Sequence, residues 1–510
     1  MRTKSTIKNG VWASASYIII FVLGLLARKA FLSNFDDSIL GYSGVISNIF
    51  SLISLAELGV GTVISYGLYK EVEKKDENQI AKLMMIYKWL YRVIGAMVLV
   101  AGIVCFFFLP MIIVEPDTNW TYVYVVYAIE LANAVMIYFL SFRRLLFVAC
   151  QKEYLCIRVE TSTQIAAYIV RIVTAYFTDL YIVYLSSIMV ANVIANIIIS
   201  TMCNRLYPYA RHTRITLADM REQNVLHDIK AYAIQKLSIV IYGGIDNIIA
   251  MRILGVSSVV MLTNYATVEG GASGFFNKLL SGFQPGIGSL IYDEKQNNRE
   301  KVFNSLNLLS FVIAAFVGVC YIVLLQPFIS LWVGEKYLLP FSYVIWFSIN
   351  QYIGWNHRML SYFRSAIGKF EEDQKYMISS AAINVVLSIL FVRVWGVSGL
   401  LAATVIAHML QWIGRCKVVF SNIIGRQLMK KYWFQQVGLS ILAAGEVWLA
   451  VFCTSFIGDG LIGFAAKILI CILLPNLINL VAVWRMPDFD YGRELIKDLL
   501  VKLKCRINLR

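Results

Sequence analysis

Long apolar segments recur along the whole chain, and they limit what it can fold into more than any other feature. A helix that crosses a bilayer needs about 20 mostly apolar residues, and we count fourteen such segments. They are 10–32, 39–68, 88–109, 121–142, 159–179, 181–203, 234–254, 257–290, 304–326, 339–363, 376–393, 396–414, 434–457 and 460–484. The pattern predicts an all-α integral membrane protein with about 14 transmembrane helices.

The composition agrees with this pattern. Of the 510 residues, 59% are hydrophobic and 15% are charged, and the mean hydropathy is +0.67. A soluble domain has about 25% charged residues, so this chain has too little polar surface to cover itself in water. An ordinary soluble enzyme is excluded.

The charges alternate between the connections that join the apolar segments. Basic residues fill the connections 70–82, 143–158, 205–221, 295–301 and 415–431. The opposite connections carry acidic residues, namely Asp36, Asp37, Glu115, Asp117, Asp179 and Glu335. Because cytoplasmic connections are rich in Lys and Arg, both termini are predicted to be cytoplasmic. The basic residues of these cytoplasmic connections explain the net charge of +15, so no nucleic acid partner is expected.

A weak internal repeat predicts how the helices are grouped. When the chain is shifted by 223 residues, Tyr42 falls on Tyr265 and Tyr69 on Tyr292. Six spans followed by six of the same orientation imply two parallel six-helix lobes, with two extra C-terminal helices. The predicted domains are an N-terminal lobe (1–203), a cytoplasmic linker (204–233), a C-terminal lobe (234–414), a cytoplasmic loop (415–433), spans 13 and 14 (434–484) and a basic amphipathic tail on the membrane lipid (485–510).

Four segments carry a resemblance to a known family. They are LAELGVGTVISYGLYK (55–70), TNYATVEGGASGFFNKLLSGFQPGIGSLIYDE (263–294), PFISLWVGEKYLLP (327–340) and FRSAIGKFEEDQKYMISSAAINVVLSI (363–389). In order and spacing the chain resembles Wzx-type polysaccharide flippases of the multidrug/oligosaccharidyl-lipid/polysaccharide exporter superfamily. This resemblance implies two six-helix lobes around a V-shaped cavity in the bacterial cytoplasmic membrane.

The resemblance also implies a function. Such a protein flips undecaprenyl-diphosphate-linked oligosaccharide repeat units for capsule, exopolysaccharide or O-antigen synthesis by alternating access. A polysaccharide polymerase and assembly proteins are the expected partners. The alternatives within the superfamily are a peptidoglycan-precursor flippase and a multidrug exporter. From another class, a membrane polysaccharide polymerase or ligase is disfavoured, because short acidic outer connections leave no room for catalytic residues.

Cations inside the predicted spans are candidates for holding a diphosphate headgroup. A charged side chain at the centre of a span costs about 2.5–3.5 kcal/mol on insertion scales, and guanidinium groups bind phosphates in a bidentate way. The candidate substrate-binding residues are Arg28, Lys29, Arg171, Arg252, Lys278 and Arg358. The alternative for Arg28, Lys29 and Arg252 is that they extend to the lipid headgroups.

Acids inside the spans are candidates for coupling to a gradient of H⁺ or Na⁺. An apolar setting favours the protonated form of a carboxyl group, which proton coupling requires. The candidates are Asp246, Glu130, Glu269 and Glu57, with Asp246 first because Gly243, Gly244 and Asn247 surround it. The alternative for each acid is a structural ion pair.

Sequence motifs of enzymes are absent from the chain. It has no GK[ST] phosphate-binding loop, no nucleophile elbow and no pattern of metal ligands. We therefore expect no catalytic residues, no cofactor and no metal. The glycines of GASGFFNKLLSGFQPGIG lie in an apolar span and predict close helix packing.

Overall fold

The computed structural model describes ten parts of the chain. These are residues 2–53, 60–113, 119–210, 245–281, 287, 296–367, 372, 374–458, 460–490 and 492–494. Within them all regular secondary structure is helical, and nine helices are long and apolar enough to cross a membrane. The predicted all-α membrane fold is confirmed.

The chain divides into two compact units, Met1–Lys278 and Leu279–Arg510. This division groups residues by their contacts, whereas the lobes 1–203 and 234–414 rest on a sequence repeat. Those lobe boundaries stay a prediction.

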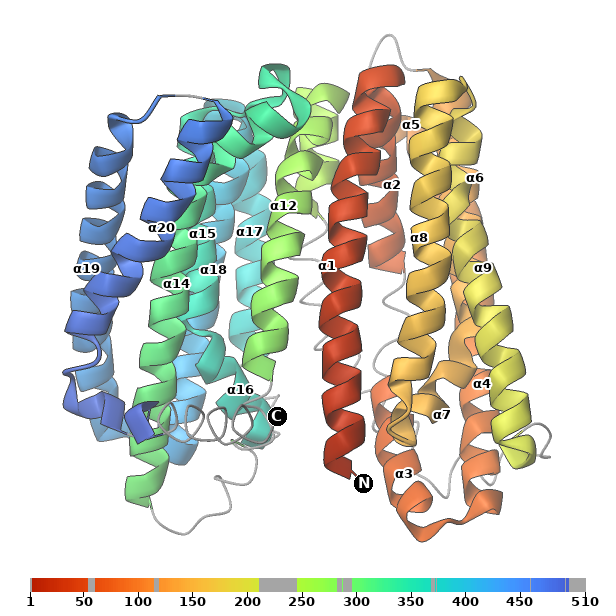
Figure 1. The fold of residues 1–510 in the computed structure, drawn as a ribbon, viewed down its shortest axis with the longest axis horizontal. Helices are drawn as coiled ribbons and strands as arrows, with labels where there is room; N and C mark the ends of the chain where they lie inside the picture. The colour runs from red at the N-terminus through yellow and green to blue at the C-terminus, as the bar shows by residue number, and fades with distance from the viewer. Residues whose placement is uncertain are drawn as a thin grey trace. The chain divides into compact units, whose positions relative to one another are not determined.

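Unit 1 contains the helices from α1 to α12 (Figure 1). The longer ones are α1 (Arg2–Asn34), α2 (Ser38–Ile53), α3 (Val60–Lys74), α4 (Glu77–Phe106), α6 (Trp120–Leu140), α8 (Glu153–Phe177), α9 (Tyr181–Leu206) and α12 (Val256–Ser281). Short helices α5 (Leu109–Ile112) and α7 (Arg144–Ala149) connect some of them. Helix α8 packs between α1 and α9, and α6 packs against α2, α4 and α9.

Unit 2 is built around α14 (Gln296–Val333), which packs against α15, α19 and α20. Its other helices are α15 (Phe341–Asn356), α16 (Arg358–Ile367), α17 (Gln374–Trp395), α18 (Val397–Val419), α19 (Met429–Ser455) and α20 (Leu461–Ala482). In the most apolar 18-residue stretch of α14, 67% of the residues are buried, compared with 11% in the corresponding stretch of α20. The first is therefore a core helix, and the second presents most of its apolar surface outward.

Local chemistry sets several helix ends. The side chain of Asp76 caps α4 by accepting a hydrogen bond from the amide of Gln79 at 3.0 Å. Between α17 and α18 the chain turns at a single residue, Gly396, whose φ of 56° suits glycine best. The connection between α8 and α9 is also tight, because only residues 178–180 separate the two helices.

Several predicted spans differ from the helices. The segment 339–363 is two helices, because the chain breaks at His357 between α15 and α16. The segment 39–68 contains α2 and the start of α3, and residues 54–59 between them lie outside the described part. Helix α8 begins at Glu153, six residues before the predicted 159. Hydropathy marks only the part of a helix that matches the bilayer core, so charged helical turns beyond it are missed.

Candidate functional site

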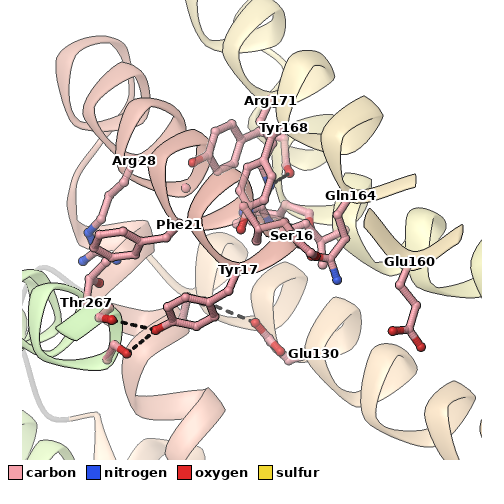
Figure 2. Close-up of a pocket in the computed structure, with 18 of the residues that line it drawn as sticks. Ser16, Tyr17, Phe21, Arg28, Glu130, Glu160, Gln164, Tyr168, Arg171 and Thr267 are labelled. Atoms are coloured by element: carbon pink, nitrogen blue, oxygen red, sulfur yellow. Dashed lines mark hydrogen bonds between the residues drawn. The ribbon is translucent and has the colours of Figure 1, made fainter. Parts of the chain in front are cut away.

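A cavity of about 850 Å³ lies within unit 1, lined by residues of α1, α2, α6, α7, α8, α9 and α12 (Figure 2). Its wall includes six charged side chains: Arg28, Arg144, Arg171, Glu130, Glu153 and Glu160. Charged groups that leave bulk water need partners. The charged side chains whose charge is not neutralised by protein partners therefore indicate what the cavity can bind.

Arg28 projects from α1 toward α12. Its Nε donates to Oδ1 of Asn264 at 2.5 Å, and an Nη donates to Oγ1 of Thr263 at 2.7 Å. Asn264 is fully buried. The guanidinium is thus held in a fixed orientation by neutral oxygens while it lines the cavity.

Arg171 projects from α8 toward α9. Its Nε donates to the carbonyl of Tyr184 at 3.0 Å and to Oγ of Ser187 at 3.1 Å. The other contact is a longer one of 3.5 Å from Nη2 to the carbonyl of Leu185. Within the described residues, Nη1 has no hydrogen-bond partner and the side chain forms no ion pair. One edge of this guanidinium is therefore available to an anion in the cavity.

Tyr184 places the two arginines at the same end of the cavity. Its hydroxyl donates to the carbonyl of Ala27, next to Arg28, at 3.0 Å. The guanidinium carbon of Arg171 lies 4.7 Å from the centre of its ring. One buried tyrosine thus contacts Arg171 and the residue next to Arg28, and both arginines line the cavity. We call these two residues the arginine pair.

Glu130 of α6 lines this cavity and a second one of about 280 Å³. It accepts hydrogen bonds from the hydroxyls of Ser43 at 3.3 Å and Ser47 at 3.4 Å. Among the described residues it forms no ion pair, although Arg171 acts on it electrostatically. A carboxyl group held by two hydroxyls is chemically able to exchange a proton or to contact a small cation.

Arg144 of α7 is held by two glutamates of α8. It donates to Glu153 from Nη2 and to Glu160 from Nε, both at 2.8 Å. Two carboxylates around one guanidinium leave a net charge of −1 in this charged triad. Glu160 and Arg171 are eleven residues apart on α8, which is about 16 Å along the axis. The cavity is therefore negative at the triad and positive at the arginine pair.

Aromatic side chains also line the cavity, and Figure 2 shows Tyr17, Phe21 and Tyr168 among them. The hydroxyl of Tyr17 donates to the carbonyls of Gly270 at 2.5 Å and Gly271 at 2.9 Å. A Cβ at Gly271 would overlap the ring of Phe21. Gly271 and Gly274 thus accept the aromatic rings of α1, whereas residues 282–286 and 288 of this glycine segment lie outside the described residues, so its close packing stays a prediction.

The structure brings together only some of the predicted cations. Arg28 and Arg171 line one cavity. Lys29 and Arg252 are exposed, and Arg252 has no hydrogen-bond or ion-pair partner among the described residues. Arg358 belongs to unit 2, where its guanidinium lies 4.7 Å from the ring centre of Trp355. The side chain of Lys278 lies outside the described residues.

The predicted acids are likewise separated. Glu130 lies in the cavity, whereas Glu269 of α12 accepts a hydrogen bond from Ser273 at 2.6 Å. Asp246 is half-buried in the helical segment 245–254, and Glu57 lies outside the described residues. The charged triad was not predicted. The signal was the spacing of seven residues between Glu153 and Glu160, which places both on one helix face.

Comparison with known proteins gives matches among solved structures alone. Neither a protein-family model nor a curated protein matches the sequence. The "inward closed" lipid II flippase MurJ superposes with a TM-score of 0.65 at 14% identity, over 95% of this chain and 99% of MurJ. The chain has the fold of the MOP superfamily transporters.

Two further structures show the same fold. An inward-facing multidrug resistance MATE transporter of the MOP superfamily matches with a TM-score of 0.66 at 14% identity, over 83% of this chain and 99% of that one. A MOP superfamily transporter from Pyrococcus furiosus matches with a TM-score of 0.59 at 15% identity, over 84% and 97% of the two chains. All three matched proteins are named as flippases or transporters, and the likeness of this chain to them is one of fold.

Proposed function

We propose that this protein flips undecaprenyl-diphosphate-linked oligosaccharide repeat units across the bacterial cytoplasmic membrane by alternating access, for surface polysaccharide synthesis. The observation that carries the proposal is the arginine pair. Arg28 and Arg171 line one cavity in a MOP-type fold, and Arg171 keeps one guanidinium edge clear of partners within the described residues. A compact diphosphate is the ligand that two guanidinium groups recognise best.

The extent of the structural match favours a lipid-linked substrate over a small drug. The lipid II flippase matches 95% of the chain, compared with 83% for the inward-facing MATE transporter. A site for cationic drugs should be dominated by acids, whereas here an arginine pair occupies one end of the cavity. The peptidoglycan precursor remains the second candidate, because lipid II also carries a diphosphate.

The other predicted residues receive secondary roles in this proposal. Glu130 is the ion-coupling candidate in the cavity, because it lines the cavity, is held by two hydroxyls and forms no ion pair among the described residues. Lys29, Arg252, Lys278 and Arg358 are proposed to guide the headgroup outside the cavity. Asp246, Glu269 and Glu57 stay alternative coupling sites for H⁺ or Na⁺, and both termini are proposed to be cytoplasmic.

Complementation of two bacterial strains tests the function. One lacks its polysaccharide flippase, and the other is depleted of its lipid II flippase. We expect this protein to restore surface polysaccharide in the first strain and not growth in the second. Rescue of the second strain alone would instead assign the peptidoglycan precursor, and rescue of neither would contradict both.

Matched variants test the arginine pair in the same strains. Arg28→Ala should reduce export at least tenfold, because a charge-assisted hydrogen bond contributes about 1.5–3 kcal/mol. Arg158→Ala is the control, since it removes an exposed cation that does not line the cavity and has no proposed role in substrate binding. Membrane abundance is measured for each variant. Equal export by the two variants would remove Arg28 from the substrate path.

A further inference from the structure

Unit 2 contains a buried carboxyl group that the proposed function does not use. Glu446 of α19 is 1% exposed. Among the described residues neither of its carboxyl oxygens has a hydrogen-bond partner, and it forms no ion pair. A buried polar group without a partner requires an explanation, and for a carboxyl group inside a membrane the explanation is usually functional.

The residues along α19 on both sides of Glu446 are apolar. Leu439 and Ala443 pack in one cluster with residues of α14, and Ala450 packs in another with Val319 and Cys471. An ionised carboxylate between these clusters would be without water and without a countercharge. Its charged form is therefore strongly disfavoured, and the neutral acid is the form that fits this packing.

The groups that face Glu446 are polar but uncharged. Asn479 of α20 is 3% exposed and lies beside the carboxyl group, and among the described residues neither its amide oxygen nor its nitrogen has another partner. Tyr352 of α15 is near enough for the carboxyl group to act electrostatically on its hydroxyl. Helix α14 contributes Cys320, which packs in the adjacent apolar cluster. A protonated acid can donate to the amide oxygen of Asn479, which would satisfy both groups.

A row of hydrogen bonds leads from this region along α19 toward Met429. The hydroxyls of Tyr352 and Ser440 are 3.1 Å apart. Asn356 donates to Tyr352 at 3.4 Å and to Gln436 at 2.8 Å. Ser440 precedes Glu446 by six residues, which is about 9 Å along the helix. The row gives polar groups between the buried acid and one end of the helix.

We propose that Glu446 is a proton-binding site of unit 2, paired with Asn479. The carboxylate takes H⁺ from water when the carboxyl group is hydrated, becomes neutral and packs as seen here. It returns H⁺ to water when α19 and α20 separate enough to hydrate it. A metal ion is disfavoured, because hard cations take about six or more oxygen ligands, and the described residues contain no cluster of metal-ligating side chains.

Infrared spectroscopy of the purified protein in lipid tests proton binding without any transport substrate. The band of a protonated carboxylic acid should be present at neutral pH, should be absent from Glu446→Gln, and should disappear reversibly as pH is raised. Glu153→Gln is the control, because Glu153 forms an ion pair with Arg144, whereas Glu446 forms none among the described residues. An unchanged band in Glu446→Gln would overturn the proposal. A band that never titrates would identify a permanently neutral structural acid and overturn it too.

A second measurement tests whether this proton is coupled to transport, and this part rests on the proposed function. In proteoliposomes, Glu446→Gln should still equilibrate the undecaprenyl-diphosphate-linked sugar between the two leaflets. The stimulation of this transport by a pH gradient should be at least tenfold smaller than in the wild-type protein. Full stimulation in Glu446→Gln would overturn the coupling. If the wild-type protein does not move this lipid at all, the proposed function fails, while the infrared result still decides proton binding.

Discussion

Individual charges in unit 1 are stabilised in different ways, and these differences decide what each can do. Arg144 is neutralised by two carboxylates, whereas Arg28 and Arg171 are oriented by neutral oxygens. Hydrogen bonds to carbonyls and hydroxyls fix a guanidinium without cancelling its charge. Arg171, which forms no ion pair among the described residues, therefore retains the positive field that a diphosphate requires.

Replacing Arg171 by lysine tests whether the guanidinium geometry matters. An ammonium group cannot contact the Tyr184 carbonyl and Ser187 while presenting a planar edge to the cavity. The expected loss of about 1.5–3 kcal/mol corresponds to a tenfold to hundredfold weaker Kd for undecaprenyl diphosphate, at about 1.4 kcal/mol per decade. Arg158→Lys is the control, because Arg158 is an exposed residue of the same helix that stacks on Trp12. An unchanged Kd for Arg171→Lys would assign that residue to structure.

The charged triad makes a prediction about stability. The side chains of Arg144 and Glu160 are 37% and 31% exposed, so their coupling energy should be about 0.5–1 kcal/mol. Double-mutant cycles of Arg144→Ala and Glu160→Gln, measured by reversible unfolding in mixed detergents, give this energy. It should fall as salt is raised. A coupling energy of zero at low salt would mean that the contact contributes nothing to stability. Glu130→Gln is the control for the loss of a carboxylate alone, because Glu130 forms no ion pair among the described residues.

The sequence predicted part of the cavity because a charge in an apolar segment is conspicuous. Arg28, Arg171 and Glu130 were identified in this way, and the structure places them around one cavity. Arg144, Glu153 and Glu160 were missed, because they lie where an apolar segment ends and resemble residues of a cytoplasmic connection. Their role depends on α7 folding back against α8, which no local pattern encodes.

At the scale of helices, glycine decides how closely neighbours approach. Gly274 of α12 faces Tyr17 of α1, and a Cβ there would overlap the tyrosine ring. Gly270 lies one turn earlier, and a Cβ there would meet nothing within 4 Å. These two positions on one helix separate the effect of packing from the effect of helix propensity.

Alanine at these two glycines should therefore have opposite effects. Gly274→Ala should destabilise the protein by about 1–3 kcal/mol, because overpacking displaces Tyr17. Gly270→Ala should be neutral or stabilising by up to about 1 kcal/mol, because alanine is the better helix former. Unfolding in mixed detergents measures both. Adding Tyr17→Ala to Gly274→Ala should cost less than the sum of the single changes, and strict additivity would show that the two residues do not meet.

Helix extents were predictable to the degree that apolar residues mark them. The segments 181–203, 376–393 and 434–457 agree with α9, α17 and α19 within a few residues. The break at His357 was not predicted, because the polar run Asn356–Arg358 is short, lies between apolar residues and contains no proline. There the carbonyl of Ile353 is bonded to both the amide and the ring Nδ1 of His357, a local contact that hydropathy does not register.

At the scale of the whole molecule, the alternating charges imply a direction across the membrane. The superposition with MurJ covers 95% of the chain, whereas the orientation rests on the charge pattern. That pattern places the connections with Lys152 and Arg426 in the cytoplasm and those with Asp179 and Glu335 outside. These four residues are exposed, so a cysteine at each should be reachable from its own side.

Labelling of single added cysteines with an impermeant thiol reagent tests this orientation in each unit separately. In unit 1, Lys152 and Asp179 flank α8, whose 25 residues give about 38 Å between its ends, so a reagent confined to one side cannot reach both. In unit 2, Glu335 follows α14 and Arg426 follows α18. In intact cells, Asp179→Cys and Glu335→Cys should be labelled above the wild-type background of nine native cysteines. Lys152→Cys and Arg426→Cys should be labelled only after the membrane is opened. The reverse pattern in both units would invert the proposed direction of flipping, and opposite patterns in the two units would refute two lobes of the same orientation.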